Sequence, residues 1–245
     1  MPRFALSSIM GADGVFSGDE AHHIAKVHRM KEGDQLEAVF GGVVYVAKIN
    51  HIQFNRVEVS LIGERPSPEP SVKVSLYQGL LKADKVELVV QKGVELGVWS
   101  IHPVECARSI VKVESGNMDT KLRRWQKIAS EAAKQSGRAL VPEVQEPISL
   151  NMALREAVAD LKLIAHESSE HGIASVLKEG SWQSVAVLVG PEGGFTAEEV
   201  QNAQEAGFIA VGLGPRILRA ETAPLVMLSI IMYEIGDLGG RTCQR

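Results

Sequence analysis

Cysteine is scarce in this sequence: its 245 residues include only Cys106 and Cys243. Neither belongs to a CxxC pair or lies beside a histidine cluster, so the sequence predicts no metal site. The adjacent His22 and His23 do not alter this, because neighbouring helix positions point about 100° apart. Cys243 lies in a polar tail, which argues against a structural disulfide, and we expect a reducing, cytoplasmic setting.

Long apolar segments and an excess of positive charge are also missing. No stretch approaches the ~20 apolar residues that span a bilayer, and the first four residues, MPRF, do not begin the apolar run of a signal peptide. We therefore expect no membrane partner. With 26 lysines and arginines against 30 aspartates and glutamates, the net charge is −4. That balance argues against a surface coated in positive charge but allows a local basic patch for nucleic acid.

A linker divides the chain into two predicted domains. Residues 64–71 read ERPSPEPS, and a segment with three prolines, two serines and three charges does not pack as a core element. We therefore expect a first domain at residues 1–70 and a second at residues 71–245.

The first domain is predicted to be rich in strands. Apolar and polar residues alternate in three short runs, at 35–40, 43–49 and 56–62. The pair Gly41-Gly42 supplies a turn between two of them. With a single helix expected over 20–30, the pattern favours a compact β-barrel.

The second domain is predicted to be an α/β fold. Short apolar runs typical of buried parallel strands alternate with segments whose apolar residues recur at helical spacing. Ser149 is a candidate helix N-cap, and Thr196 with Glu199 fits a capping box. The alternation predicts a mostly parallel sheet. The expected strands are 72–78, 100–105, 161–165, 185–189 and 208–213, and the expected helices are 85–97, 119–138, 149–160, 196–206 and 222–235.

Two loops follow successive expected strands, at the end of the sheet where parallel α/β proteins bind ligands. The first, residues 190–195, reads GPEGGF, and its three glycines bring bare backbone groups close to a ligand. The second, residues 213–223, reads LGPRILRAETA. Neither contains the phosphate-binding pattern GxxxxGK[ST] or the dinucleotide pattern GxGxxG, and no GxSxG nucleophile elbow is present. Unless both loops are merely tight turns, they predict a backbone-rich pocket for something other than a nucleoside triphosphate or NAD.

Longer strings make these loops recognisable. LVGPEGGF (188–195) and LGPRILRAETAPL (213–225) resemble the signatures of the SPOUT methyltransferases. More narrowly, they resemble the RsmE-type family, which methylates N3 of a uridine in small-subunit (16S) ribosomal RNA. The same family is matched by HHIAKVHRMKEGD (22–34), by GLLKADKVELVVQKGVELGV (79–98) and by RWQKIASEAAKQSGR with VPEV (124–144). These five segments occur in one order over nearly the whole chain.

The resemblance implies a fold, a cofactor and an assembly. It implies a SPOUT-type α/β catalytic domain whose C-terminal chain threads a loop to form a trefoil knot, against the usual rule of unknotted chains. It also implies a small N-terminal PUA-like β-barrel that binds RNA, and S-adenosylmethionine held by the knot loops. Two subunits are expected to pack across the cofactor sites. The apolar helix at 222–235 is either wholly internal or half of that dimer interface, and the family implies the latter.

The resemblance also assigns residues to S-adenosylmethionine. Backbone groups of the two loops are expected to read the adenine edge, and the apolar Ile217 and Leu218 to cover its faces. His166 is more often an ordinary loop histidine than a base, so we assign it no proton transfer. The cofactor-binding residues carried over are Ala165, His166, Val189, Gly190, Glu192, Gly194, Leu213, Gly214, Ile217, Leu218 and Thr222.

Three residues are candidates for catalysis. N3 of uridine is a poor nucleophile while protonated, so methylation needs loss of that proton or stabilisation of the N3 anion. Arg219 would stabilise negative charge on the uracil carbonyls. Glu221 would accept the proton or orient Arg219, unless it is only a first-turn carboxylate that favours the next helix N-terminus. Arg138 is a third candidate, for the substrate face.

Two basic clusters are candidates for RNA contact. From Arg108 to Arg138 the chain has eight basic residues against three acidic ones. This excess suits phosphate contacts, or else forms a solvated helix face. The predicted RNA-binding residues are Arg3, His23, Lys26 and Arg29 in the first domain, and Arg108, Lys112, Arg123, Arg124, Lys127 and Arg138 in the second.

Two other functions stay open from the sequence. A related knotted enzyme would methylate a ribose 2′-OH or another base, and a non-catalytic RNA-binding protein would keep the fold without the donor site. The intact GPEGG and RILRAET strings speak against the second of these. The expected partners are 16S ribosomal RNA within the small ribosomal subunit and a second copy of the chain.

Overall fold

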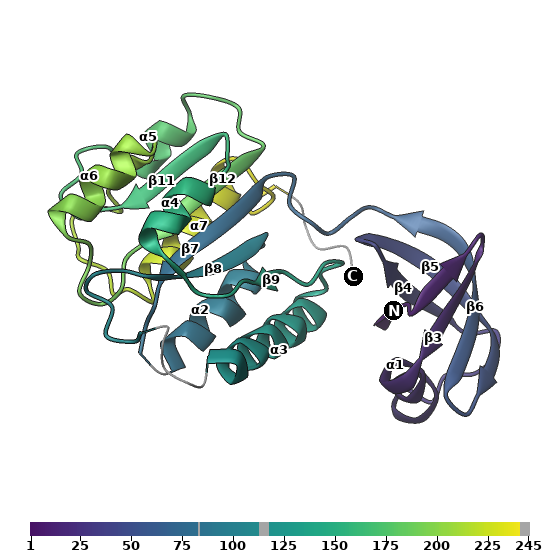
Figure 1. The fold of residues 1–245 in the computed structure, drawn as a ribbon. Coiled ribbons are helices and arrows are strands. Elements are labelled where there is room, and N and C mark those ends of the chain that lie inside the picture. The colour runs from purple at the N-terminus through teal and green to yellow at the C-terminus, as the bar shows by residue number, and fades with distance from the viewer. Residues whose placement is uncertain (83, 113–117, 241–245) are drawn as a thin grey trace. The chain divides into compact units, whose positions relative to one another are not determined.

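The computed structural model describes residues 1–82, 84–112 and 118–240, and the chain forms two compact units (Figure 1). The first unit comprises Met1–Glu69 together with Lys134–Leu140, and the second comprises Pro70–Ala133 and Val141–Arg245. The composition of Lys134–Leu140 did not predict its place in the first unit, because this segment continues a helical pattern. Cys106 is buried as a free thiol, whereas Cys243 lies outside the described residues.

In the first unit, six strands form one curled sheet. The pairing runs as an open path among the described residues, parallel between the first two strands and antiparallel elsewhere. Side chains of one face form a core around Phe16, Ile24 and Leu36. The three strands that come first along the chain, β1 to β3, were not predicted, because they are too short to show a clear alternation. In order across the sheet, the strands are β1 (Arg3–Ala5), β4 (Gln35–Phe40), β5 (Val43–Gln53), β6 (Arg56–Arg65), β3 (Asp13–Ser17) and β2 (Ser8–Met10).

The helix expected over 20–30 has a different form. A short helix, α1 (Gly18–His22), continues into a π-helix, η1 (His23–Val27). The N–H of His28 donates to the carbonyl of His23 at 2.9 Å, the i→i+5 bond of a π-helix. Arg29 then adopts a φ of 53°, in the left-handed region, and the helix ends. Apolar spacing did not reveal this wider turn, because Ile24 would be buried in either helix type.

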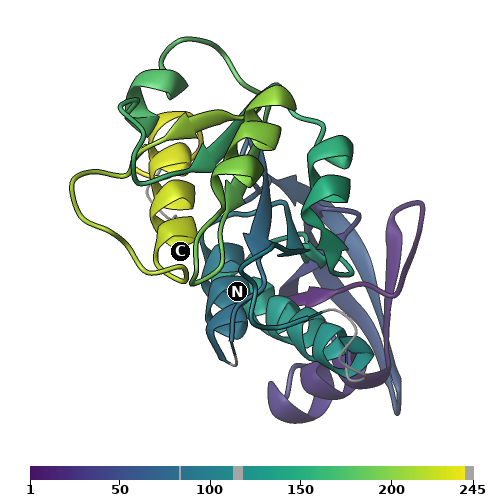
Figure 2. The same cartoon turned by 60° about the vertical axis from the view of Figure 1, so that its left-hand side comes forward.

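In the second unit, a parallel sheet carries helices on both faces (Figures 1 and 2). Every described strand pair in this sheet is parallel, which confirms the predicted α/β fold. The two shortest strands were missed, since two residues show no periodicity. The order is β10 (Ile148–Ser149), β8 (Ser100–Glu105), β7 (Lys73–Gly79), β12 (Ser184–Val189), β11 (Leu161–Ala165) and β13 (Ile209–Val211), with β9 (Glu143–Val144) also paired to β8.

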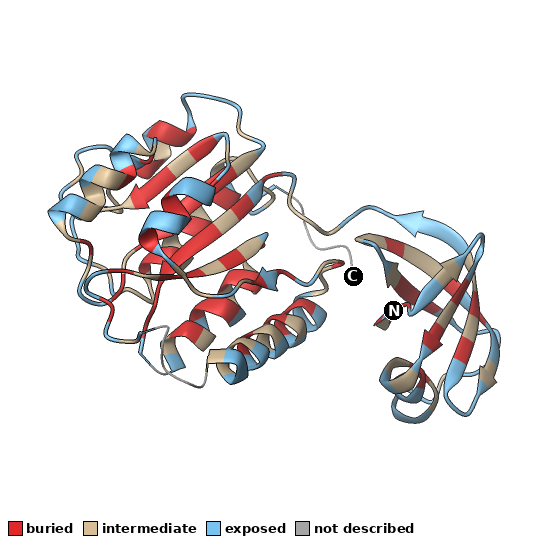
Figure 3. Ribbon diagram, in the orientation of Figure 1, coloured by how far each residue is buried: buried red, intermediate tan, exposed pale blue. Residues whose placement is uncertain are grey.

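Two apolar cores lie on the two faces of this sheet. Along β12, Val187 and Val189 belong to one core and Leu188 to the other, as the alternation of a strand requires. Figure 3 shows β7 and β12 buried over almost their whole length. Helices α2 (Asp84–Glu95), α3 (Met118–Ser136), α5 (Ile173–Leu177) and α7 (Ala223–Glu234) cover the first face, and α4 (Leu150–Glu156) and α6 (Ala197–Glu205) cover the second.

The predicted helix caps are confirmed. The Ser149 hydroxyl accepts the N–H of Met152, and Thr196 with Glu199 forms a complete capping box at the start of α6. The helix expected over 149–160 ends earlier, at Glu156. Within the described ranges, no helix has the length and apolar character needed to cross a membrane.

Candidate functional site

A pocket lies at the carboxyl ends of β11, β12 and β13 in the second unit. Its volume is about 470 Å³, within the range of small-molecule sites. The residues that follow these three strands line it, and Lys85 at the start of α2 joins them. Ligands bind at this end of parallel α/β sheets. Both loops that were predicted from the sequence to form a pocket lie here.

The loop after β12, residues 190–195, is shaped by its glycines. Gly194 adopts a φ of 68°, which favours glycine, and its N–H donates to the carbonyl of Pro191 at 2.9 Å. At Gly190, an added Cβ would lie 3.2 Å from the ring of Phe195. The glycines therefore allow a tight turn that exposes backbone groups to the pocket.

The end of β7 holds this loop in place. The buried side-chain amide of Gln78 donates to the carbonyl of Gly190 at 3.3 Å. The next residue, Gly79, lies so close that a Cβ would be 2.5 Å from the backbone nitrogen of Pro191. Since β7 is central in the sheet, these contacts fix the loop before any ligand binds.

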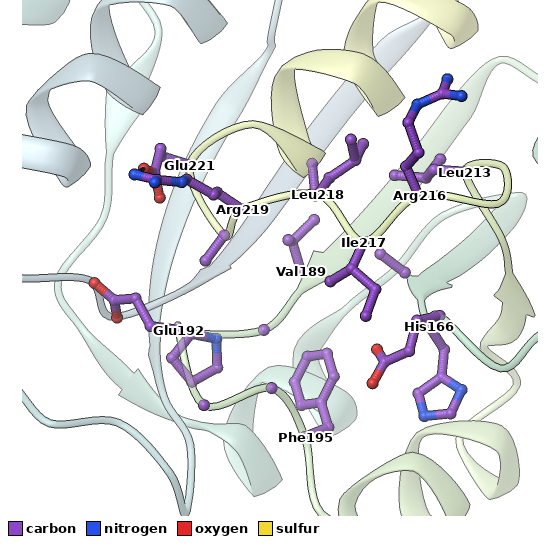
Figure 4. Close-up of a pocket in the computed structure, with 18 of the residues that line it drawn as sticks. His166, Val189, Glu192, Phe195, Leu213, Arg216, Ile217, Leu218, Arg219 and Glu221 are labelled. Atoms are coloured by element: carbon purple, nitrogen blue, oxygen red, sulfur yellow. Dashed lines mark ion pairs between the residues drawn. The ribbon is translucent and has the colours of Figure 1, made fainter.

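The loop after β13 leads into α7. Gly214 adopts a φ of 103°, again a conformation that favours glycine. The carbonyl of Arg219 accepts the N–H groups of Thr222 and Ala223, both at 2.9 Å, and this turn begins the helix. Ile217, which lies between Gly214 and Arg219 in the sequence, is 85% exposed. Figure 4 shows its side chain in the middle of the pocket lining, between Val189 and His166.

One end of the pocket carries opposite charges. The Nζ atom of Lys85 lies 3.1 Å from a Glu221 oxygen and 3.4 Å from a Glu192 oxygen. Figure 4 shows Arg219 beside Glu221, with 3.9 Å between their charged atoms. Burial raises the pKa of both carboxyl groups, but backbone N–H groups and Lys85 more than offset it, so each pKa lies below its usual value. Both glutamates are therefore ionised at neutral pH.

The structure brings together all but one of the predicted cofactor-binding residues. Thr222 is the exception, because it lies in the turn before α7 and not among the residues that line the pocket. Contact of any of them with a cofactor stays a prediction. The residues that do line the pocket are Ala165, His166, Val189, Gly190, Glu192, Gly194, Leu213, Gly214, Ile217 and Leu218.

Three charged residues line the pocket without having been predicted: Lys85, Glu167 and Arg216. Glu167 directly follows His166 at the end of β11, so the rule that ligands bind at strand ends would have found it. Arg216 lies inside the second loop. The sequence gives a weaker signal for Lys85: it is a lysine in the first turn of a helix, where acidic side chains are favoured.

The three predicted catalytic residues lie in different places. Arg219 and Glu221 line the pocket, with side chains that are 83% and 13% exposed. Arg138 belongs to the first unit, where its guanidinium donates to Glu69 at 3.0 and 2.6 Å and its side chain is 6% exposed. The contact of Arg138 with Glu69 is thus that of a structural ion pair, and its roles in catalysis and RNA binding stay predictions.

The predicted RNA-binding residues of the first unit are mostly on the surface. His23, Lys26 and Arg29 are exposed on and after the π-helix. Arg3 instead pairs with Glu37 at 2.7 Å. Both a π-turn and a non-glycine residue at positive φ often accompany functional sites, and here they occur together.

In the second unit, most of the predicted RNA-binding side chains have acidic or backbone partners. Arg108 donates to the carbonyls of Gly193 and Phe195, at 3.1 and 3.2 Å, and so supports the first pocket loop. Arg123 is exposed on α3. These pairings reduce the positive field expected from counting charges. The ion pairs are Lys112 with Glu105, Arg124 with Glu87 and Lys127 with Glu131, at 3.2, 2.6 and 4.0 Å.

Comparison with known families matches both units. Residues 67–232 match the family described as RNA methyltransferase domain, and residues 16–62 match the RNA methyltransferase PUA domain. The fold and the pocket therefore define a two-domain RNA methyltransferase.

Individual relatives narrow this class. The chain is 40% identical to the ribosomal RNA small subunit methyltransferase E of Bacillus subtilis, over 91% of each chain. It is 33% identical to the protein of that name in Mycobacterium tuberculosis, over 90% of this chain and 86% of the other. The chain belongs to the ribosomal RNA small subunit methyltransferase E family, which confirms the family predicted from its strings.

Two solved structures share the whole fold. One is a ribosomal RNA small subunit methyltransferase E from Neisseria gonorrhoeae bound to S-adenosylmethionine, with a TM-score of 0.84, 32% identity and coverage of 97% of this chain and 99% of the other. Another is a Legionella pneumophila protein in complex with the same cofactor, with a TM-score of 0.79, 33% identity and coverage of 96% and 98%. The predicted α/β domain with a PUA-like N-terminal domain is thus confirmed, and the trefoil knot stays a prediction.

Proposed function

We propose that this protein transfers a methyl group from S-adenosylmethionine to N3 of a uridine in small-subunit (16S) ribosomal RNA. The observation that carries the proposal is the pocket between the two glycine-shaped loops, with Arg219 and Glu221 at one end of it. Membership of the methyltransferase E family supports the RNA substrate.

The pocket suits S-adenosylmethionine in size and charge. Its volume of about 470 Å³ fits a small ligand. Its lining carries both signs of charge, and such a lining can pair with the sulfonium and ammonium groups of the cofactor as well as with its carboxylate. The charged lining residues are Glu167, Glu192, Glu221, Lys85, Arg216 and Arg219. The glycines at 190 and 194 leave backbone groups free to read an adenine, while Ile217 and Leu218 supply apolar cover. When bound, the cofactor supplies the methyl group and leaves as a neutral thioether.

Arg219 and Glu221 are the residues that we expect to act on the acceptor base. Methylation at N3 requires that the N3 proton leave and that negative charge on the flanking carbonyls be stabilised. The exposed guanidinium of Arg219 can reach a base that enters from solvent. Glu221, ionised and 3.9 Å from Arg219, either accepts the proton or orients the guanidinium.

The wider setting extends this proposal. We infer that the chain acts in the cytoplasm on RNA within the small ribosomal subunit, and that it works as a homodimer. Leu225 in α7 and Ile235, which directly follows that helix, are only partly buried within their own unit, and so leave apolar surface for a second copy. Sedimentation at the mass of a single 26.5 kDa chain would contradict the dimer.

Calorimetric titration tests the donor site. We expect S-adenosylmethionine to bind with one site per chain, and S-adenosylhomocysteine, which lacks the sulfonium charge, to occupy the same site in competition. Complete absence of binding heat at several temperatures would refute the enzyme and favour a non-catalytic RNA-binding protein.

RNA binding is tested at Arg29. Glycine accepts the left-handed φ of 53° without strain but adds freedom to the unfolded chain, so Arg29→Gly should change the free energy of unfolding by less than about 1 kcal/mol. The lost charge should weaken RNA binding and reduce its salt dependence by about one phosphate contact. Arg29→Lys, which keeps the charge, is the control. Equal RNA affinity and salt slope for the glycine variant and the unchanged protein would remove Arg29 from the interface.

A further inference from the structure

Lys85 stands out as the pocket residue whose position in its own helix is unfavourable. It lies in the first turn of α2, where the helix dipole favours negative side chains and where Asp84 and Glu87 also lie. Its ammonium group nevertheless lines the pocket. The dipole mildly disfavours a cation in this place, so acidic partners outside the helix stabilise it there.

Those partners are one carboxylate from each pocket loop. Glu192 belongs to the loop after β12 and Glu221 to the loop after β13, and Lys85 lies 3.4 and 3.1 Å from them. Their side chains are 22% and 13% exposed, so both charges are partly withdrawn from water. The Oε2 atom of Glu221 is buried, and it is the oxygen that the Lys85 ammonium meets at 3.1 Å. Lys85 therefore offsets the desolvation of two carboxylates that the pocket holds close together.

The two cations near Glu221 are not equivalent. Lys85 lies 3.1 Å from one carboxylate oxygen, while the Arg219 guanidinium lies 3.9 Å from the other. The Lys85 side chain is 35% exposed and that of Arg219 is 83% exposed. Because attraction strengthens with shorter distance and lower exposure, Lys85 is the stronger partner of Glu221. Pairing with Glu221 also raises the pKa of Lys85 despite its partial desolvation, so the lysine stays charged at neutral pH.

We propose that Lys85 is a positioning residue for methyl transfer: it neutralises Glu221 and Glu192, and so leaves Arg219 free to meet the acceptor base. The proposal rests on the proposed function of the pocket. If Lys85 were absent, Glu221 would hold an uncompensated charge, and Arg219 would be drawn to it and away from the substrate. Lys85 thus acts on the reaction through Glu221 and Arg219 without touching the base itself.

Kinetics on small-subunit ribosomal RNA test this through coupled substitutions. Lys85→Met is expected to lower kcat about tenfold, with a much smaller change in the dissociation constant of S-adenosylmethionine. Lys85→Arg, which keeps a cation, should restore most of the rate. Lys85→Met should cost little when Glu221→Gln is already present, because no carboxylate then competes for Arg219. Independent, multiplicative losses in the double variant would overturn the proposal.

Lys92→Met is the matched control. Lys92 lies in the same helix and pairs with Glu95 at 2.8 Å, but it is not among the residues that line the pocket. Its removal should leave kcat within about twofold of the unchanged protein, as is usual for surface positions. A loss equal to that of Lys85→Met would show that any lysine on α2 matters, and would contradict the proposal.

A crystal structure of Lys85→Met supplies a readout that does not depend on activity. In that variant the Arg219 guanidinium should approach Glu221 to about 2.8 Å, the distance of a charge-assisted hydrogen bond. An unchanged separation of 3.9 Å would overturn the proposal. If the unchanged protein methylates no ribosomal RNA, the proposed function fails, and this separation still decides whether Lys85 holds Glu221 away from Arg219.

Discussion

Replacement of Arg219 by alanine is expected to lower kcat about 100-fold, the usual effect of removing one charge-stabilising group from an active site. The guanidinium is 83% exposed and contacts Glu221 only at 3.9 Å, so its loss should leave the fold and the loops intact. The dissociation constant of S-adenosylmethionine should therefore change little. Single-turnover kinetics with calorimetry of cofactor binding would separate the two effects.

Arg216 provides the comparison for Arg219. It carries the same charge in the same loop, and Figure 4 shows its side chain directed away from Arg219 and Glu221. Arg216→Ala should reduce kcat much less than Arg219→Ala. If the two variants lose the same activity, general loss of positive charge explains the effect. If Arg219→Ala loses only cofactor affinity, Arg219 is a cofactor-binding residue and not a catalytic one.

Replacement of Gly194 by valine is expected to abolish most cofactor binding. Gly194 has a φ of 68°, and a β-branched residue there costs about 1–3 kcal/mol of backbone strain. Strain lowers affinity only as far as the empty loop relaxes and must be strained again to bind; each 1.4 kcal/mol regained on binding corresponds to about tenfold in affinity. The valine side chain adds bulk where backbone groups of the 190–195 loop face the pocket.

Gly207→Val separates strain in the pocket from strain elsewhere. Gly207 follows α6 with a φ of 87°, and like Gly194 it has open space where a Cβ would be. It does not line the pocket. Both variants should therefore lose stability in thermal unfolding, but Gly207→Val should bind S-adenosylmethionine normally. Normal binding by Gly194→Val would mean that the pocket has been placed wrongly.

Much of the fold could be predicted from local patterns. Buried parallel strands are short apolar runs, and the caps at Ser149 and Thr196 follow from hydroxyl side chains that satisfy free N–H groups. What escaped prediction has no local signature. The π-turn at His23–Val27 keeps Ile24 buried just as an α-helix would, and Lys134–Leu140 leaves the second unit in the middle of a helical pattern.

The parts of the pocket formed by residues that follow strands in the sequence could be predicted. Gly190 directly follows β12 and Gly214 comes three residues after the end of β13, so a rule about strand ends was enough to place them. Lys85 was missed because it reaches Glu192 and Glu221 only after folding brings α2 beside two later loops. Arg108 was expected to contact RNA, yet its hydrogen bonds support the backbone of Gly193. Charge counting finds such arginines but does not identify their partners.

Analysis of methylated nucleosides most directly tests the central claim. Small ribosomal subunits that lack the modification would be incubated with the purified protein and S-adenosylmethionine carrying an isotopically labelled methyl group. The RNA would then be digested and its nucleosides separated by mass spectrometry. We expect the label in 3-methyluridine, and the Arg219→Ala protein should produce far less of it. Label in a 2′-O-methylated nucleoside or another base, or no labelled nucleoside at all, would contradict the proposed reaction.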